Sequence, residues 1–332
     1  MAQTTQKKRF RARHILLTLA ALSLLAVVAV WALAQVSWRV RGALDVVSRI
    51  PVSELRLTAR AGGETITLDT FGLTLAGDLY RPANPDGSAV VLLHGSSPYG
   101  RKLALYPVLA KALADRGHTV LSIDQRGFGD SEDPDRSSVD GMDATHDVVA
   151  ALDFLETLPG IDPGRMHLIG HSLGGGVAMA AMVVDPRPAS VTAIGPPRRT
   201  PERMRDQFDT LRARYRHDRQ LGADVPEDVF RAHMADFYLE NLLPYLGGPG
   251  HIPLLLLDGG LEDPVDLAYL GDYAARVAPP FLYGTVAGTH HYLNTVGRLS
   301  PGVAVYDQGM LDQVVDAISG WMKTPGVQPG SP

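Results

Sequence analysis

The amino-acid sequence predicts an α/β fold built around a mostly parallel β-sheet. Short apolar runs, typical of buried strands, alternate along the chain with longer segments of helical periodicity. The run at 89–93 is continuously apolar, as expected for a strand that helices cover on both faces. Polar loops follow the runs at their carboxyl ends, where open parallel sheets place their working residues.

The composition indicates a globular protein with a sizeable core. The chain has 332 residues, of which 45% are hydrophobic and 20% charged. Its net charge of -5 gives no indication of a nucleic-acid partner. It contains no cysteine, which excludes disulfides, thiolate catalysis and cysteine metal sites.

The first residues are typical of a membrane-targeting segment. A basic tail over residues 1–14 precedes an uncharged stretch over 15–36, rich in Leu, Ala and Val and long enough for one bilayer crossing. The basic tail predicts a single-pass anchor with its N-terminus in the cytoplasm and the rest of the chain outside. The alternative is a signal peptide cleaved near Ala34, which would give a secreted protein.

The globular domain is expected over residues 64–322, after a juxtamembrane connector at 37–63 and before a disordered tail at 323–332. Its first two strands alternate apolar and polar residues, which predicts an antiparallel hairpin at the sheet edge. The hairpin strands are expected at 65–70 and 73–80, further strands at 89–93, 119–123, 165–169, 190–194, 253–257 and 281–286, and helices at 106–116, 143–158, 177–184 and 310–321.

One segment, residues 198–251, interrupts this alternation and contains no clear strand. Two sets of apolar residues in it have helical spacing, so we expect a small helical lid between two strands. The sets are Met204, Phe208, Leu211 and Tyr215, then Phe230, Met234, Phe237 and Tyr238. The lid is rich in arginine, which is typical of a solvated polar face or of a surface for anionic lipid or substrate.

The stretch around Ser172 predicts a nucleophile. Gly170, Ser172 and Gly174 fit the G-x-S-x-G pattern of a nucleophile elbow, with an expected strand before it and an expected helix after it. The serine must stand at the tip of a tight turn, where larger flanking side chains would collide. The helix that follows offers unpaired N–H groups and the positive end of its dipole.

A serine hydroxyl needs a base to remove its proton, and the base must be held by an acid. If the chain order is serine, acid, histidine, only His290 and His291 end a strand in the correct region. A sharp turn beginning at Gly288 favours His291 as the base and leaves His290 as the alternative. His171, inside the elbow, is set aside because its backbone faces the wrong way to serve its neighbour.

The acid should follow the strand at 253–257. Asp263 is favoured because the next residue, Pro264, makes a rigid corner there, and Glu262 is the second choice. A helix N-cap is the alternative role for Asp263. The other nearby acids are Asp258 and Asp266.

Two backbone N–H groups should stabilise an oxyanion at this site. One belongs to Leu173, the residue after the nucleophile. The other belongs to Ser96, just beyond His94 and Gly95 in the loop after the first parallel strand.

Over residues 64–322 the chain resembles the α/β-hydrolase superfamily. The resemblance is carried by residues 92–95, the loop 124–131, residues 170–174, Asp263 and the histidine pair. It implies a three-layer α/β/α sandwich with an eight-stranded, mostly parallel sheet and a lid after the sixth strand. It also implies an acyl-enzyme at Ser172, a structural role for the loop 124–131, no metal and no organic cofactor.

The sequence therefore predicts a serine hydrolase that cleaves a small-molecule or lipid-like carboxylic ester. Thioesterase, lipase and peptidase activity stay open, because this fold hosts all of them. A serine at the elbow, in place of an aspartate, argues against dehalogenase and epoxide-hydrolase chemistry. A non-catalytic binding or scaffolding protein on the same fold is the alternative from a different class.

Overall fold

The computed structural model describes residues 18–32, 62–97, 99–197, 201–217, 225–235, 237, 239–294 and 308–325. Chain contacts divide the protein into two units. The helix at 18–32 belongs to the first unit, and all the other described residues belong to the second.

The helix over residues 18–32 corrects the membrane prediction. The predicted span was 15–36, and its two ends, like residues 1–14 and the connector up to residue 61, lie outside the described residues. Within the described part of the chain, no helix is long and apolar enough to cross a bilayer. The prediction of a single-pass membrane protein with its main domain outside the cytoplasm is therefore wrong.

The second unit is organised around one eight-stranded sheet of order β1-β2-β4-β3-β5-β6-β7-β8. β1 and β2 form an antiparallel hairpin, β2 pairs antiparallel with β4, and every later pair is parallel. This confirms the mostly parallel sheet. The strands are β1 (Glu64–Thr70), β2 (Leu73–Tyr80), β3 (Ala89–Leu93), β4 (Thr119–Ile123), β5 (Met166–His171), β6 (Ser190–Ile194), β7 (Leu254–Gly259) and β8 (Phe281–Val286).

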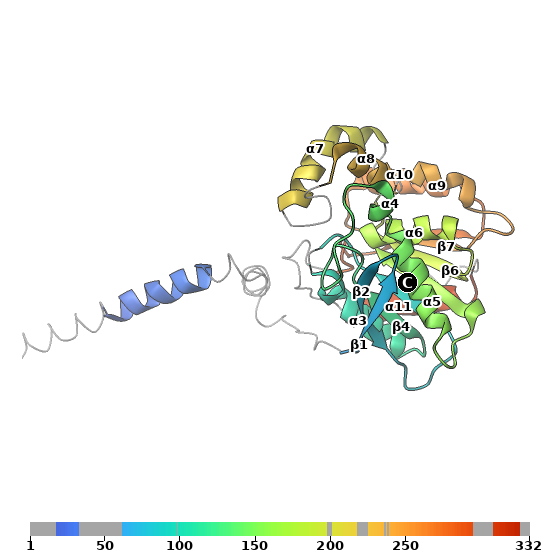
Figure 1. Ribbon diagram of the computed structural model, residues 1–332, viewed down its shortest axis with the longest axis horizontal. Helices are drawn as coiled ribbons and strands as arrows, with labels where there is room; N and C mark the ends of the chain where they lie inside the picture. Colours follow the sequence, from blue (N-terminus) through green and yellow to red (C-terminus); the bar gives the residue numbers. More distant parts are fainter. Residues whose placement is uncertain are drawn as a thin grey trace, which may run out of the picture. The chain divides into compact units, whose positions relative to one another are not determined.

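Helices cover both faces of the sheet, as Figure 1 shows. Alternate residues of β3 contribute to two separate apolar clusters: Val91 to a cluster with α5, α6 and α10, and Val90 to one with α3 and α11. Successive strand side chains point to opposite faces, so a strand buried on both faces is apolar throughout. The helices are α3 (Leu105–Ala114), α4 (Val139–Met142), α5 (Thr145–Glu156), α6 (Leu173–Val184), α10 (Pro264–Ala274) and α11 (Gln308–Lys323), and the short 3-10 turns are η2 (Gly100–Lys102) and η3 (Pro163–Arg165).

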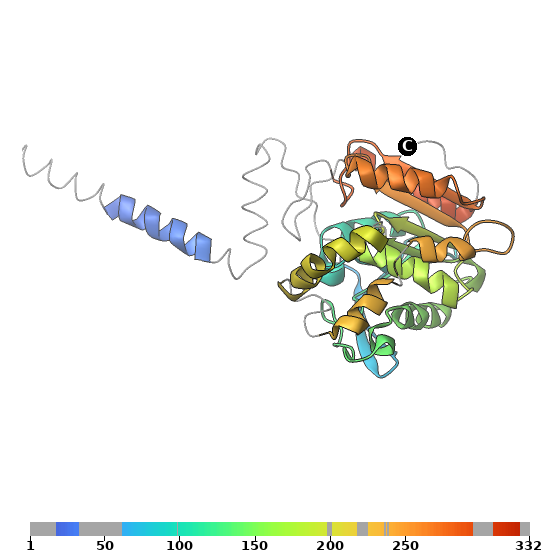
Figure 2. The same cartoon turned by 90° about the horizontal axis from the view of Figure 1, so that it is seen from above.

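Between β6 and β7 the chain forms α7 (Pro201–His217), α8 (Glu227–Ala235), α9 (Leu239–Leu242) and the 3-10 turn η4 (Leu243–Tyr245). The rings of Phe208 in α7 and Phe230 in α8 meet edge to face, with centroids 5.4 Å apart. Figures 1 and 2 show these helices grouped on the side of the domain that carries α6. Phe237, after α8, packs closely against Gly176 in α6: a Cβ added at Gly176 would lie 2.8 Å from the Phe237 ring.

Candidate active site

Ser172 stands between β5 and α6 in a strained backbone conformation. Its φ of 53° and ψ of -118° are unfavourable for a residue with a Cβ. Its N–H donates to the carbonyl of Ile194 in the next strand, at 2.8 Å. A Cβ at Gly170 would lie 2.0 Å from the Gly174 carbonyl oxygen, and one at Gly174 would lie 2.5 Å from that of His94. Neither position accepts a side chain, so the turn needs both glycines.

Residues 94–97, which we call the oxyanion loop after the role expected of Ser96, pass directly against Ser172. A Cβ at Gly95 would lie 2.9 Å from the Cβ of Ser172. The structure thus brings the loop that contains Ser96 to the start of α6, where Leu173 is the first helical residue. These are the two residues whose N–H groups the sequence assigned to the oxyanion.

Hydrogen bonds of the His94 and Tyr106 side chains hold the oxyanion loop in place. His94 Nδ1 donates to the Gly95 carbonyl at 2.7 Å, and His94 Nε2 accepts from the Gln125 N–H at 3.0 Å. Burial lowers the pKa of His94, which favours the neutral ring that these two bonds require. The Gly95 N–H in turn donates to the Tyr106 hydroxyl at 2.6 Å.

His291 lies beside the elbow. A Cβ at Gly195, the residue after Ile194, would lie 3.0 Å from His291 Nδ1. The ring of His291 is 4.8 Å from the ring of His171, centroid to centroid. The backbone of His290 bonds to Leu293 and Asn294 and closes the turn after β8. These contacts favour His291 over His290 as the base.

Three acids lie in β7 and in the loop after it, in different settings. The carboxylate of Asp263 is exposed and caps α10, where it accepts the Val265 N–H at 2.9 Å. Glu262 Oε2 lies 3.7 Å from His291 Nδ1, with the Glu262 side chain 17% exposed. Asp258 is fully buried, and its Oδ1 lies 3.6 Å from where a Gly195 Cβ would stand. The Glu262 carboxylate is thus close to the His291 ring.

The loop 124–131 is built as a support for the site. The Asp124 carboxylate accepts the backbone N–H groups of Arg101 at 2.6 Å and of Asp130 at 2.8 Å, and it also pairs with the Arg101 guanidinium. Both Asp124 and Arg101 are buried. A Cβ at Gly129 would lie 2.1 Å from this carboxylate, so the loop closes tightly around it.

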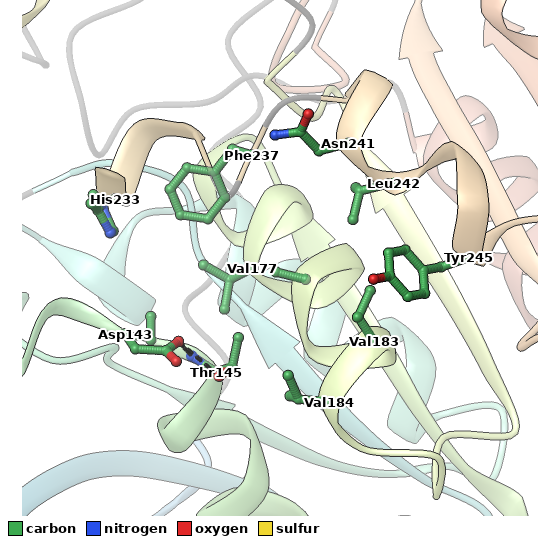
Figure 3. Close-up of a pocket in the computed structure, with 12 residues that line it drawn as sticks. Asp143, Thr145, Val177, Val183, Val184, His233, Phe237, Asn241, Leu242 and Tyr245 are labelled. Carbon is green, nitrogen blue, oxygen red and sulfur yellow. Dashed lines mark hydrogen bonds between the residues drawn. The ribbon is translucent and has the colours of Figure 1, made fainter. Parts of the chain in front are cut away.

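A pocket of about 250 Å³ lies under the lid, along α6 (Figure 3). Its apolar wall comes from α6 and from the segment that follows α8, and its polar groups come from α4–α5 and the lid. Neither Ser172 nor His291 lines it. The lining residues are Asp143, Ala144, Thr145, Val177, Ala180, Val183, Val184, His233, Phe237, Asn241, Leu242 and Tyr245. Among the residues that the structure describes, no cluster of three or more His, Asp or Glu side chains could hold a metal ion.

Three residues near the nucleophile were missed by sequence reasoning or given second place: Tyr106, His171 and Glu262. Tyr106 carries no signal in the sequence, because it is one apolar-face residue of an ordinary helix. His171 was considered only as a base and set aside, although a polar residue buried inside the elbow could have suggested a positioning role. Glu262 directly precedes a proline corner that drew attention to its neighbour.

Comparison with known proteins agrees with this architecture. The model of the alpha/beta hydrolase family matches residues 90–308. The polyketide transferase grgF of Penicillium sp. is 30% identical over 197 residues, which cover 58% of this chain and 60% of that protein. The thiohydrolase aneE of Aspergillus aculeatus is 35% identical over 133 residues, which cover 40% of each protein.

Among solved structures, Est1E from Butyrivibrio proteoclasticus with bound ferulic acid has a TM-score of 0.56 at 17% identity. The match covers 78% of this chain and 98% of that one, and it shows likeness of fold. The chain spans between 37% and 60% of the length of the first curated relatives that it matches. The match of the family model over most of the globular part shows that this chain belongs to the alpha/beta hydrolase family.

Proposed function

We propose that this protein is a serine hydrolase that cleaves carboxylic esters of small-molecule or lipid-like substrates. The observation that carries the proposal is Ser172, held at a positive φ between β5 and α6 and in close contact with the oxyanion loop, while the ring of His291 lies 4.8 Å from that of the adjacent His171. Strain of this kind persists only where the surroundings impose it, and it is typical of functional residues.

In the proposed reaction His291 takes the proton of Ser172 while the serine oxygen attacks the carbonyl carbon of the ester. The backbone N–H groups of Ser96 and Leu173 stabilise the oxyanion. His291 then protonates the leaving alcohol, and water, activated by the same histidine, releases the acid from Ser172. Glu262 is proposed as the acid that orients His291, in place of Asp263, because its carboxylate is 3.7 Å from Nδ1.

Thioester hydrolysis is the second candidate. Its support is the similarity to the thiohydrolase aneE, at 35% identity over 133 residues. The mechanism is unchanged, since only the leaving group differs, so the two activities must be separated by assay.

The test compares the full chain with Ser172→Ala, His291→Ala and His290→Ala on a p-nitrophenyl ester and on the matching acyl thioester. We expect turnover of the ester by the wild type, its loss in Ser172→Ala and His291→Ala, and its retention in His290→Ala. Faster turnover of the thioester would favour the second candidate. A folded wild type that turns over neither substrate would favour a binding or scaffolding protein.

A further inference from the structure

Tyr106 and His171 lie between the two halves of the active site and belong to neither the proposed triad nor the oxyanion donors. Tyr106 comes from α3, and His171 is the last residue of β5, directly before the nucleophile. Both side chains are fully buried. They fill the space between the oxyanion loop, residues 94–97, and the histidine loop, residues 287–294.

Three hydrogen bonds run in series through this pair. The Gly95 N–H donates to the Tyr106 hydroxyl oxygen at 2.6 Å. The Tyr106 hydroxyl and His171 Nδ1 are 2.9 Å apart, and His171 Nε2 is 2.8 Å from the backbone carbonyl of His291. The series therefore begins in the oxyanion loop and ends on the backbone of the histidine proposed as base.

The donor and acceptor of each hydrogen bond follow from the two groups at the ends of the series, the Gly95 N–H and the His291 carbonyl. The carbonyl of His291 can only accept, so His171 Nε2 carries a proton and donates it. A neutral His171 then accepts at Nδ1 from the Tyr106 hydroxyl, whose oxygen receives the Gly95 N–H. Burial raises the pKa of Tyr106 well above its usual value, so its proton stays on the oxygen. Every donor in the series has one acceptor.

The packing leaves little freedom around this series. A Cβ at Gly95 would lie 3.1 Å from both His171 Nδ1 and the Tyr106 oxygen. In a buried site, a hydrogen-bonding group that loses its partner is not compensated by bulk water. A shift of either loop would therefore break a bond in the series.

We propose that Tyr106 and His171 are positioning residues that couple the oxyanion loop to the histidine loop, so that the oxyanion donors and the base keep one geometry around Ser172. This inference rests on the proposed function, since it assigns the pair a role in that reaction. Small misplacements of reacting groups lower rates by up to about 100-fold.

The test uses variants that cut the series at different bonds. Tyr106→Phe keeps the ring and removes the first two bonds. The amide of His171→Gln reaches the position of Nε2, so it keeps the donor to His291 and loses the acceptor for Tyr106. The amide of His171→Asn reaches the position of Nδ1, so it keeps that acceptor and loses the donor. Tyr273→Phe is the matched control, because it removes another buried hydroxyl, bonded to the Leu239 carbonyl at 2.7 Å, away from the site.

We expect kcat for a p-nitrophenyl ester to fall by about 10- to 100-fold in Tyr106→Phe and in His171→Asn, with KM changed less than about twofold. The double variant Tyr106→Phe/His171→Gln should have the same kcat as Tyr106→Phe alone, because both substitutions remove the bond between the two side chains. Tyr273→Phe should lower the melting temperature to a similar extent and leave kcat unchanged.

Folded variants with kcat within about twofold of the wild type would overturn the coupling, and so would losses that multiply in the double variant. Turnover by the wild type tests the proposed function separately. An inactive wild type would overturn both the function and the coupling, whereas an active wild type with unaffected variants would overturn the coupling alone.

Discussion

Ser172 can adopt its strained conformation because glycines at three positions around it allow other parts of the chain to approach closely. Gly170 and Gly174 allow the turn itself, and Gly95 allows the oxyanion loop to touch the serine. The first two could be read from the sequence motif. The third could not, because it depends on an approach between residues far apart in the chain.

The close approach at Gly95 predicts a large loss of activity for Gly95→Ala. The added methyl group would meet the Cβ of Ser172 at 2.9 Å and His171 Nδ1 at 3.1 Å, so the oxyanion loop must move. We expect kcat/KM for a p-nitrophenyl ester to fall by about 100-fold or more. Gly271→Ala is the control, because nothing lies within 4 Å of a Cβ there, and it should raise stability by about 0.5–1 kcal/mol through helix propensity with no change in rate. An unchanged rate in Gly95→Ala would contradict the described contact.

The sequence leaves two roles open for Asp263, because a triad acid and a helix N-cap are both acidic residues placed before a helix. Asp263-Pro264 fits either role, and in the structure the Asp263 carboxylate caps α10. We expect Glu262→Gln to lower kcat/KM by about 100-fold or more, whereas Asp263→Asn should leave it nearly unchanged, since asparagine also caps helices. Steady-state kinetics of the two variants shows which of the two carboxylates acts as the acid. The reverse pattern would restore Asp263 as the acid.

At the scale of elements, the sheet and its covering helices followed from hydrophobic pattern. Short, mainly apolar runs predicted β3 to β7, and alternation predicted the hairpin of β1 and β2, as the structure shows. The links between elements could not be predicted in this way. The series from Gly95 to His291 joins four segments through single side chains, and no local pattern reports such contacts.

The support under the oxyanion loop gives a prediction for stability. Arg101 is 3% exposed and pairs with the buried carboxylate of Asp124 and with Asp78 at 3.1 Å. Arg101→Met would leave a buried charge uncompensated, which typically costs about 3–5 kcal/mol. Urea denaturation measures this loss. The matched control is Arg81→Met, which removes the exposed pair with Glu64 and should change the free energy of unfolding by less than about 1 kcal/mol. Equal effects in both variants would contradict the buried role of Arg101.

At the scale of the whole molecule, buried histidines make stability depend on pH. Burial lowers the pKa of His167 to about 4, and it does the same for His233. The unfolded chain takes up these protons near pH 6.5 but the folded protein does so only near pH 4, so stability is fully present above pH 6.5 and falls as the pH drops toward 4. Each group contributes on the order of 3 kcal/mol.

His167→Asn isolates one of these contributions. Its side chain can still bond to Ser190, which lies 2.9 Å from His167 Nδ1. We expect the free energy of unfolding, measured in urea at pH 7 and at pH 4.5, to change less with pH in this variant than in the wild type. Identical pH dependence in the two proteins would show that His167 does not titrate as its burial implies.

The wrong membrane prediction also belongs to this scale. Apolar composition over residues 15–36 predicts a span, whereas no helix among the described residues, 18–32 included, is long and apolar enough to cross a bilayer. Composition reports how a segment interacts with apolar surroundings. It does not by itself show a helix long enough to span a bilayer.

The central claim is that Ser172 is an activated nucleophile. The most direct measurement is covalent labelling of the full chain with a fluorophosphonate, followed by mass spectrometry of the modified peptide. Labelling at Ser172 in the wild type, with none in Ser172→Ala and little in His291→Ala, is the predicted result. A folded wild type that stays unlabelled, or that is labelled at another serine, would contradict the claim.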